Sequence, residues 1–538
     1  MIRAALSKYL IYPLLLLAGF GFVYRLMHIP SRQETALFCI VFFLVPTLRY
    51  PKVGVYYLFC LPLFIPMFRR MYYLISERPA LDYLMLISDG VMGGLILALI
   101  LLWILNKERS KDAFSILIVI YTLLLLIKVF VGSQLPIQEG LYGFKFNGLY
   151  VFFFFAGSYV LTTYKETRAV LGYASWLLLI TALYGINQIL FGFTGYEQKW
   201  LDSITFTTLR IEGIVRPFST YVSPAAMSDG MTILFMLGVF WMLAKGRHLK
   251  PFGLILTASS IAPIMIATVR TNWLAVAAGI FFYGVFLRLK KPWVQWTMMV
   301  LLMAGIGAYS AGGGSNGGSM AQNAVISANI NKHNPNLTDA MIKNRTAALA
   351  NPLQEYSVQK RMEIWTGILY TSLYFPLGKG QGTTGYAHSY YFLVLGEIGY
   401  PGLICFLAIL FVGFYRGMKV ISNSKDKDVV ELSRLMVTLI FMITVLNLTG
   451  THLHTPPGDI FFWFTMGCIS RFYRQWRDGE LAAKAAEKAA QEAAAAAALA
   501  KAAAAAGKPE AVEEPVEPNM AKLLFPGRKV QLPGGTHV

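Results

Sequence analysis

The chain has 538 residues, of which 56% are hydrophobic and 14% are charged, and its 47 Lys and Arg against 28 Asp and Glu give a net charge of +19. Repeated apolar runs long enough to cross a bilayer exclude a soluble globular protein and predict an all-α polytopic membrane protein. Because residues 474–538 are nearly balanced in charge, the positive excess belongs to the membrane part. We therefore expect a lipid bilayer, and no nucleic acid, among its partners.

Apolar runs of spanning length predict about 12–14 transmembrane helices within residues 1–473. The first set lies near residues 9–27, 35–49, 53–69, 83–106, 113–133, 142–164 and 168–194. The second set lies near residues 224–244, 251–268, 271–289, 292–310, 388–416, 431–451 and 456–473. The second and third runs are short and are separated only by Arg49, Tyr50, Pro51 and Lys52, which leaves the exact count open.

Basic residues cluster on alternate loops between these runs. Such loops accumulate on the cytoplasmic side of a membrane, so both termini are expected there. The clusters are Lys107, Arg109 and Lys111; Lys165 and Arg168; Lys245, Arg247 and Lys250; Lys290 and Lys291; Arg416 and Lys419; Arg471, Arg474 and Arg477. Loops 195–223 and 311–387 then face outside, and the second is a large loop before the last three helices.

Residues 474–538 differ in kind from the membrane part. Leu481–Ala506 is rich in Ala with scattered Glu and Lys, which predicts a solvated cytoplasmic helix. Pro509, Pro515 and Pro518 then predict a disordered tail. A coil that binds a partner protein is the alternative for this segment.

The most informative stretch is Arg361–Gly402, which reads R-x3-W, P-L-G-K-G-Q-G and H-S-Y-Y-x5-E-x-G-x2-G. It places His388 at the predicted start of a membrane helix, where the helix dipole disfavours imidazolium and leaves a base for a hydroxyl proton. The alternative for a single histidine is a helix cap or a core residue.

Residues upstream of His388 suit an anion. Gly378, Gly380 and Gly382 let backbone amides approach a phosphate, although a simple turn is the alternative. Arg361 and Trp365 are four residues apart and would share a helix face, which suits a phosphate with an adjoining sugar or a surface cation–π pair.

Downstream, Glu397 lies nine residues beyond His388 and so on the opposite face of an ideal helix. We expect it to bond another helix, and we expect Gly399 and Gly402 to permit a kink or close helix packing.

Several arginines lie on loops predicted to face outside, against the rule for basic residues. Each could reach lipid headgroups or pair with a carboxylate, but guanidinium groups that converge beside a histidine match the oxygens of a pyrophosphate. They are Arg69, Arg70, Arg78, Arg210, Arg216, Arg270 and Arg361. The same side carries His452 and His454, for which an acceptor-contacting or interfacial role is favoured over metal binding.

Arg361–Gly402 resembles the signature of the O-antigen ligase and O-antigen polymerase superfamily of membrane glycosyltransferases. The segments Arg210–Thr220 and Thr268–Trp273 resemble it too, so that the likeness covers roughly residues 205–415. Val269 stands where a Ser commonly precedes the arginine, and Ser389 replaces a frequent Asn.

The resemblance implies a GT-C-like fold and a metal-independent, inverting transfer without cofactors. A glycan would pass from undecaprenyl pyrophosphate to an acceptor hydroxyl at the periplasmic face of a bacterial inner membrane. His388 would be the catalytic residue and Arg270 and Arg361 the pyrophosphate ligands, with Arg210 and Arg216 as weaker candidates. Further candidates for substrate contact are Trp365, Gly380, Gly382, Ser389 and His454.

The acceptor stays open between another lipid-linked repeat unit, for a polymerase, and a lipid A core or protein, for a ligase. The segment Arg216–Pro224 favours a polymerase of O-antigen or exopolysaccharide, because it resembles segments of exopolysaccharide members. Other polysaccharide-assembly proteins of the envelope are candidate partners. A transporter of lipid-linked sugars and an envelope scaffold are the alternatives from other classes.

Overall fold

The computed structural model describes residues 31–74, 82–106, 112–204, 209–211, 214–244, 246, 248–267, 269–287 and 356–505. The predicted spans 9–27 and 292–310, most of the predicted loop 311–387 and the predicted tail beyond Ala505 lie outside these residues. The chain divides into two compact units, Met1–Arg471 and Phe472–Val538, which are described separately.

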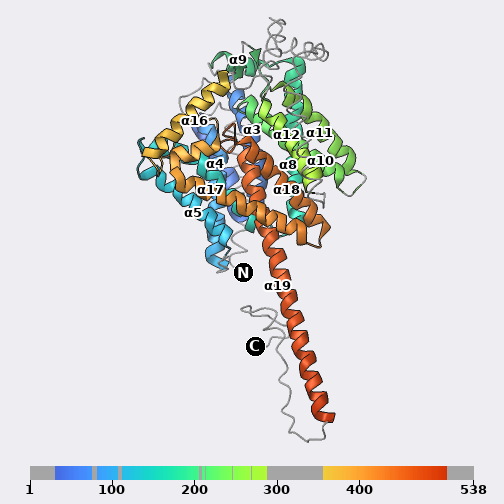
Figure 1. Ribbon diagram of the computed structural model, residues 1–538. Coiled ribbons are helices and arrows are strands. Elements are labelled where there is room, and N and C mark those ends of the chain that lie inside the picture. Colours follow the sequence, from blue (N-terminus) through green and yellow to red (C-terminus); the bar gives the residue numbers. More distant parts are fainter. Residues whose placement is uncertain are drawn as a thin grey trace. The chain divides into compact units, whose positions relative to one another are not determined.

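The first unit is a bundle of packed helices (Figure 1). Its longer helices are α2 (Arg32–Arg49), α3 (Pro51–Met71), α4 (Leu86–Asn106), α5 (Ala113–Phe130), α6 (Ile137–Gly148), α8 (Tyr164–Phe191), α9 (Gly195–Asp202), α10 (Pro224–Leu243), α11 (Leu249–Ile266), α12 (Arg270–Phe281), α16 (Tyr356–Tyr374), α17 (Tyr390–Asn423), α18 (Lys427–Leu446) and the start of α19 (Gly458–Ala505). Short helical turns are η1 (Tyr72–Leu74), η2 (Tyr83–Met85), η3 (Leu149–Phe152), α7 (Phe153–Phe155), η4 (Ala156–Val160) and η6 (Phe282–Phe286). Two-residue strands β1 (Arg210–Ile211) and β2 (Ile214–Val215) pair antiparallel.

Eight helical segments within the described residues are long and apolar enough to cross a membrane. They are Pro51–Leu74, Tyr83–Leu101, Ala113–Phe130, Tyr164–Phe191, Pro224–Leu243, Leu249–Ile266, Tyr390–Asn423 and Lys427–Leu446. This confirms a helical, polytopic membrane protein. The predicted total of about 12–14 spans and the GT-C-like arrangement stay predictions.

The structure differs from the predicted elements at several places. The predicted continuous span 142–164 is instead a series of short elements from α6 to η4, because the helical pitch changes after Gly148 and again at Ala156. Helix α17 begins at Tyr390 rather than at His388, and it is broken at Gly399, where φ is 79° and ψ is −168°. The expected kink at Gly399 is therefore confirmed. Helices α9 and α16 occupy parts of predicted loops that no apolar run had marked.

Hydrogen bonds between distant segments gather the predicted outside loops at one end of the bundle. The Arg70 guanidinium, near the end of α3, donates to the Tyr221 carbonyl at 2.6 Å. The amide of Tyr390 donates to the carbonyls of Asn447 and Gly450, both at 3.1 Å. Predicted inside segments meet each other instead, as in the Lys52–Glu166 ion pair at 2.6 Å. These contacts join segments of the same predicted set, and the side of the membrane that each end faces stays a prediction.

Helix α17 is central to the site because it packs against α5, α16 and α18 (Figure 1). Near its far end, Arg416 is buried and forms a bidentate pair with Asp112, at 2.6 and 2.9 Å, at the start of α5. Burying a charge in a membrane bundle is costly unless it is paired or hydrogen bonded. This pair fixes the far end of α17 against the start of α5.

The second unit contains the part of α19 that follows Arg471, and its side chains are almost all exposed. Ion pairs one turn apart join Lys484 to Glu480 at 3.2 Å and Lys488 to Glu492 at 3.7 Å. Such pairs and the high helix propensity of Ala account for a helix without an apolar face.

Candidate functional site

His388 lies in the turn that leads into α17, between buried Ala387 and Ser389. Its φ of 54° is unusual for a residue with a side chain, and Ser389 takes extended geometry as the helix cap. The Ser389 hydroxyl donates to the Asn447 carbonyl at 3.1 Å, so the turn is held by the loop after α18. The backbone that follows His388 is thereby held by the loop after α18.

Two aromatic contacts complete this turn. The Tyr386 ring packs edge-on against the His388 ring with centroids 4.2 Å apart. On α16, the Trp365 indole N–H donates to the Ala387 carbonyl at 2.9 Å, and its ring stacks on Phe392 at 5.0 Å. Trp365 therefore positions the turn that carries His388, which is a role the sequence did not suggest.

The electrostatic surroundings keep the imidazole neutral. Burial, and then the nearby guanidinium of Arg361, lower the pKa of His388 from 6.5 to about 4. A neutral imidazole at physiological pH can accept a proton from a bound hydroxyl. The sequence placed this effect in the helix dipole, whereas burial and Arg361 are its causes here.

Arginines from two other segments reach the same region. The guanidinium groups of Arg361 and Arg216 both act electrostatically on Tyr386, as does the carboxylate of Asp229. Arg216 also donates from Nη1 to the Ala267 carbonyl at 3.0 Å, which ties it to the segment before α12. Tyr386 thus has a ring contact with His388 and electrostatic interactions with Arg361 and Arg216.

For the other two predicted arginines the structure gives only backbone positions. Arg210 lies in β1 and pairs with Val215, the residue that precedes Arg216 in the chain. Arg270 is the first residue of α12. Their side chains lie outside the described residues. Asn272, two residues after Arg270 on α12, donates a hydrogen bond from Nδ2 to the Asp229 carboxylate at 2.8 Å.

The two loop histidines are engaged separately. His452 Nδ1 lies 2.7 Å from the buried carboxylate of Asp229 on α10. His454 Nε2 is hydrogen bonded to the side-chain oxygen of Asn147 on α6. Among the described residues no cluster of three His, Cys, Asp or Glu could hold a metal ion.

A buried polar network surrounds Asn147. Its side-chain nitrogen donates to Gln381 at 2.8 Å and to Glu397 at 2.9 Å, and the Glu397 carboxyl also accepts from the backbone amides of Gly382 and Thr384. Glu397 therefore bonds another helix, as expected, and does not pair with His388. Asn147 is a functional candidate that sequence reasoning missed, although an amide in an apolar run is itself a signal for a polar partner.

The three glycines of the P-L-G-K-G-Q-G segment all have positive φ, between 78° and 105°. A Cβ on Gly378 would lie 2.4 Å from the Glu397 carbonyl oxygen, and one on Gly380 would lie 2.6 Å from the Ser133 Cα. These two glycines permit close contact with protein backbone. Gly382 differs because it lines an open cleft, so contact with a substrate is geometrically available to it.

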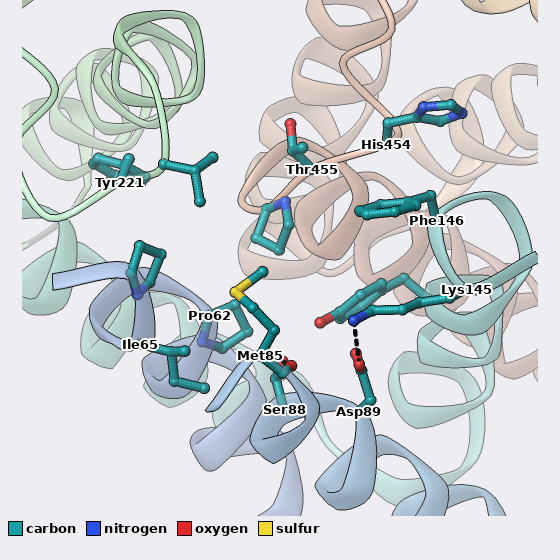
Figure 2. Close-up of a pocket in the computed structure, with 14 residues that line it drawn as sticks. Pro62, Ile65, Met85, Ser88, Asp89, Lys145, Phe146, Tyr221, His454 and Thr455 are labelled. Carbon is teal, nitrogen blue, oxygen red and sulfur yellow. Dashed lines mark hydrogen bonds and ion pairs between the residues drawn. The ribbon is translucent and has the colours of Figure 1, made fainter. Parts of the chain in front are cut away.

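Two hollows meet at this side of α6. The open cleft has a volume of about 580 Å³ and is bounded by α6, Gly382, Gly385, Glu397 and His454. A narrower pocket of about 50 Å³ lies beside it and shares Phe146 and His454 with it. Figure 2 shows Phe146 between His454 and Lys145, whose ammonium pairs with Asp89 at 2.6 Å.

Two of the remaining predicted outside arginines, Arg69 and Arg70, have structural partners. Arg69 and Arg32 both pair with Asp82, at 2.7 and 3.1 Å. Arg70 is buried and donates to the carbonyls of Ser219 and Tyr221, both at 2.6 Å. Arg69 and Arg70 therefore act on protein groups, and Arg78 lies outside the described residues.

No protein-family model matches the chain, and no curated protein matches it either. The resemblance drawn from Arg361–Gly402 therefore stays an expectation.

Proposed function

We propose that this protein is a membrane glycosyltransferase that moves a glycan from undecaprenyl pyrophosphate to an acceptor hydroxyl, with His388 as the base. The observation that carries the proposal is the meeting of a neutral histidine with arginines from separate segments. Arg361 from α16 is close enough to lower the pKa of His388, and Arg216 shares with it an electrostatic contact to Tyr386. Neutral bases and fixed cations together suit a reaction in which a phosphate leaves as an anion.

The proposed step is a displacement at the anomeric carbon. The acceptor oxygen forms a bond to this carbon while the bond to the pyrophosphate oxygen breaks, and the configuration inverts. The hydroxyl proton passes to His388, and the electron pair of the broken bond leaves on undecaprenyl pyrophosphate. Guanidinium groups aimed at that anion stabilise charge that grows in the transition state, by several kcal/mol for such preorganised groups.

In this proposal Arg361 and Arg216 bind the pyrophosphate, and Arg270 and Arg210 contribute from the starts of α12 and the β1–β2 hairpin. The enzyme lies in the inner membrane of a bacterium, with His388 at the periplasmic face and both termini in the cytoplasm. The acceptor is another lipid-linked repeat unit, which makes the protein a repeat-unit polymerase. A ligase uses the same donor chemistry and differs only in its acceptor, so the test below separates the two.

The test is the surface glycan profile, by gel, of cells whose only copy carries His388→Ala. Loss of long polymer, with single repeat units still attached to their acceptor, supports a polymerase. Polymer that accumulates on undecaprenyl pyrophosphate supports a ligase. His248→Ala is the control, because His248 is an exposed histidine before α11. An unchanged profile in His388→Ala cells with normal membrane levels of the protein would refute the catalytic role.

A further inference from the structure

The open cleft beside α6 is chemically unlike the arginine-rich side of the site. Its volume is about 580 Å³, within the usual range of about 300–1,000 Å³ for small-ligand sites. It adjoins the His388 turn, because Gly385 lines the cleft and lies three residues before His388. The Tyr390 ring, two residues after His388, also lies 5.9 Å from the His454 ring at the wall of the cleft.

The polar groups in this wall have fixed hydrogen-bonding roles. Both side-chain hydrogens of Asn147 are used, one toward Gln381 and one toward Glu397, so its oxygen must accept. The bond to His454 therefore requires that Nε2 of the imidazole carries the hydrogen and donates it. Burial also lowers the pKa of His454 to about 4, which keeps the ring neutral and leaves Nδ1 as an acceptor.

Aromatic and exposed polar side chains complete the lining. Tyr142 and Phe146 are one turn apart on α6, with rings 4.9 Å between centroids. Glu139 and Gln138 lie on the preceding turn and are exposed at the mouth of the cleft. Aromatic rings offer flat apolar contact, and carboxylate and amide groups offer paired donors and acceptors. That combination matches a pyranose ring, which has an apolar face and a rim of hydroxyl groups.

The charges of the cleft argue against a phosphate ligand. Its lining, as far as the structure describes it, contains the carboxyl groups of Glu139 and Glu397 and no lysine or arginine. The Lys145 ammonium lies 6.0 and 5.8 Å from the ring centroids of Tyr142 and Phe146, and it is paired with Asp89 in the adjoining pocket. An anion finds no counter-charge in this lining and is attracted by Arg361 and Arg216, so the two sides of the site select different parts of one substrate.

We propose that this cleft binds the uncharged sugar rings of a glycan substrate, with Tyr142 and Phe146 as the stacking surface and Gln138, Glu139 and the Asn147 network as hydroxyl partners. The inference rests on the proposed function, because it assigns the sugar chain to the cleft and the pyrophosphate to the arginines. The volume of about 580 Å³ accommodates a short oligosaccharide, so the cleft selects the glycan while His388 accepts the proton of the acceptor hydroxyl.

The experiment uses the full-length protein in lipid nanodiscs and saturation-transfer NMR. The probe is the oligosaccharide fraction released by mild acid from membranes of the cells that make this protein. Wild-type protein and His388→Ala should both transfer saturation to pyranose ring protons. Tyr142→Ala should weaken the titrated Kd by about tenfold, the loss expected for one aromatic contact. Tyr142 is 58% exposed, so this variant removes no core packing.

Two further variants make the result specific. Tyr50→Ala is the matched control, because Tyr50 is 54% exposed and lies between α2 and α3, at the other end of the bundle, and it should bind like wild type. Gln138→Ala should weaken binding as well, through loss of a hydroxyl partner. Absence of transfer from wild type, or equal Kd values for wild type and Tyr142→Ala, would overturn the sugar site.

The design also separates this inference from the proposed reaction. Sugar binding that depends on Tyr142, together with an unchanged glycan profile in His388→Ala cells, would leave the sugar site standing and overturn the transferase. Loss of sugar binding in His388→Ala would overturn the division between the cleft and the histidine.

Discussion

His388 should stay uncharged far below the pH at which imidazole ordinarily takes up a proton. Burial and Arg361 lower the pKa of His388 from 6.5 to about 4. At pH 5 a group with a pKa of about 4 is about 90% neutral, whereas an ordinary imidazole is about 3% neutral. A reaction that needs neutral His388 should therefore keep its histidine-dependent rate at pH 5, and should lose it as the pH falls through about 4.

The lowered pKa of His388 also makes the stability of the fold depend on pH. Below pH 6.5 the unfolded chain binds the proton that folded His388 refuses, so this residue makes folding less favourable as the pH falls from 6.5 toward about 4. Below that value both states are protonated and the contribution is constant. Acid should therefore weaken the fold at this residue before it inactivates the base.

The assay is acylation by diethyl pyrocarbonate between pH 4 and 7.5, because an imidazole reacts with this reagent only in its neutral form. The extent of reaction is read by mass spectrometry of the peptide that contains His388. N-acetylhistidine in the same tubes gives the unperturbed midpoint. The midpoint for His388 should lie near pH 4, and Arg361→Gln should raise it only in part, because burial is the larger cause. A wild-type midpoint near pH 6.5 would refute the reasoning, whatever the protein catalyses.

Three further substitutions test the frame that holds the site. Asp112→Asn leaves the buried guanidinium of Arg416 on α17 without a counter-charge. The free energy of unfolding should fall by about 3–5 kcal/mol, which lowers the thermal unfolding midpoint in detergent. An unchanged midpoint would contradict the pairing. Gly399→Ala should also lower the midpoint, because its Cβ would lie 2.2 Å from a carbonyl oxygen, while Gly93→Ala, which meets open space, should not. Arg70→Met removes two hydrogen bonds to segment 195–223, so trypsin should cut this segment faster than in wild type; equal rates would count against that role.

Most membrane helices could be predicted because an apolar run of sufficient length has few alternatives to a spanning helix. The region 142–164 could not, since hydropathy does not reveal where a helix changes pitch. No apolar run marks helix α16, because it is only weakly apolar and lies within a long polar loop, and only the four-residue spacing of Arg361 and Trp365 indicates a helix there. The glycine predicts the break at Gly399, but the Pro376 carbonyl oxygen, which would lie 2.2 Å from a Cβ at this position, comes from a distant contact that the sequence does not reveal.

The candidate site likewise contains some features that the sequence predicts and others that it does not. The nearness of His388 and Arg361 could be proposed from one motif, because both flank a short loop before α17. Asn147 and Asp229 could not be assigned, since their partners Glu397 and His452 are more than 200 residues away in the chain. A general signal did exist, because a polar group in an apolar run must find a partner, but the partner itself is a property of the packing.

The first turns of α17 explain how one helix can serve two unlike sides of the site. Tyr390 and Glu397 are seven residues apart and share a face, and both meet the Asn147 network, through the His454 ring and through a direct hydrogen bond. Phe392 is two residues from Tyr390, on the opposite face, where it stacks on Trp365 of α16. The helix therefore stands between the arginine of α16 and the carboxyl groups of the cleft. A phosphate and an uncharged sugar that meet at His388 would each be held on the side of α17 whose side chains suit it.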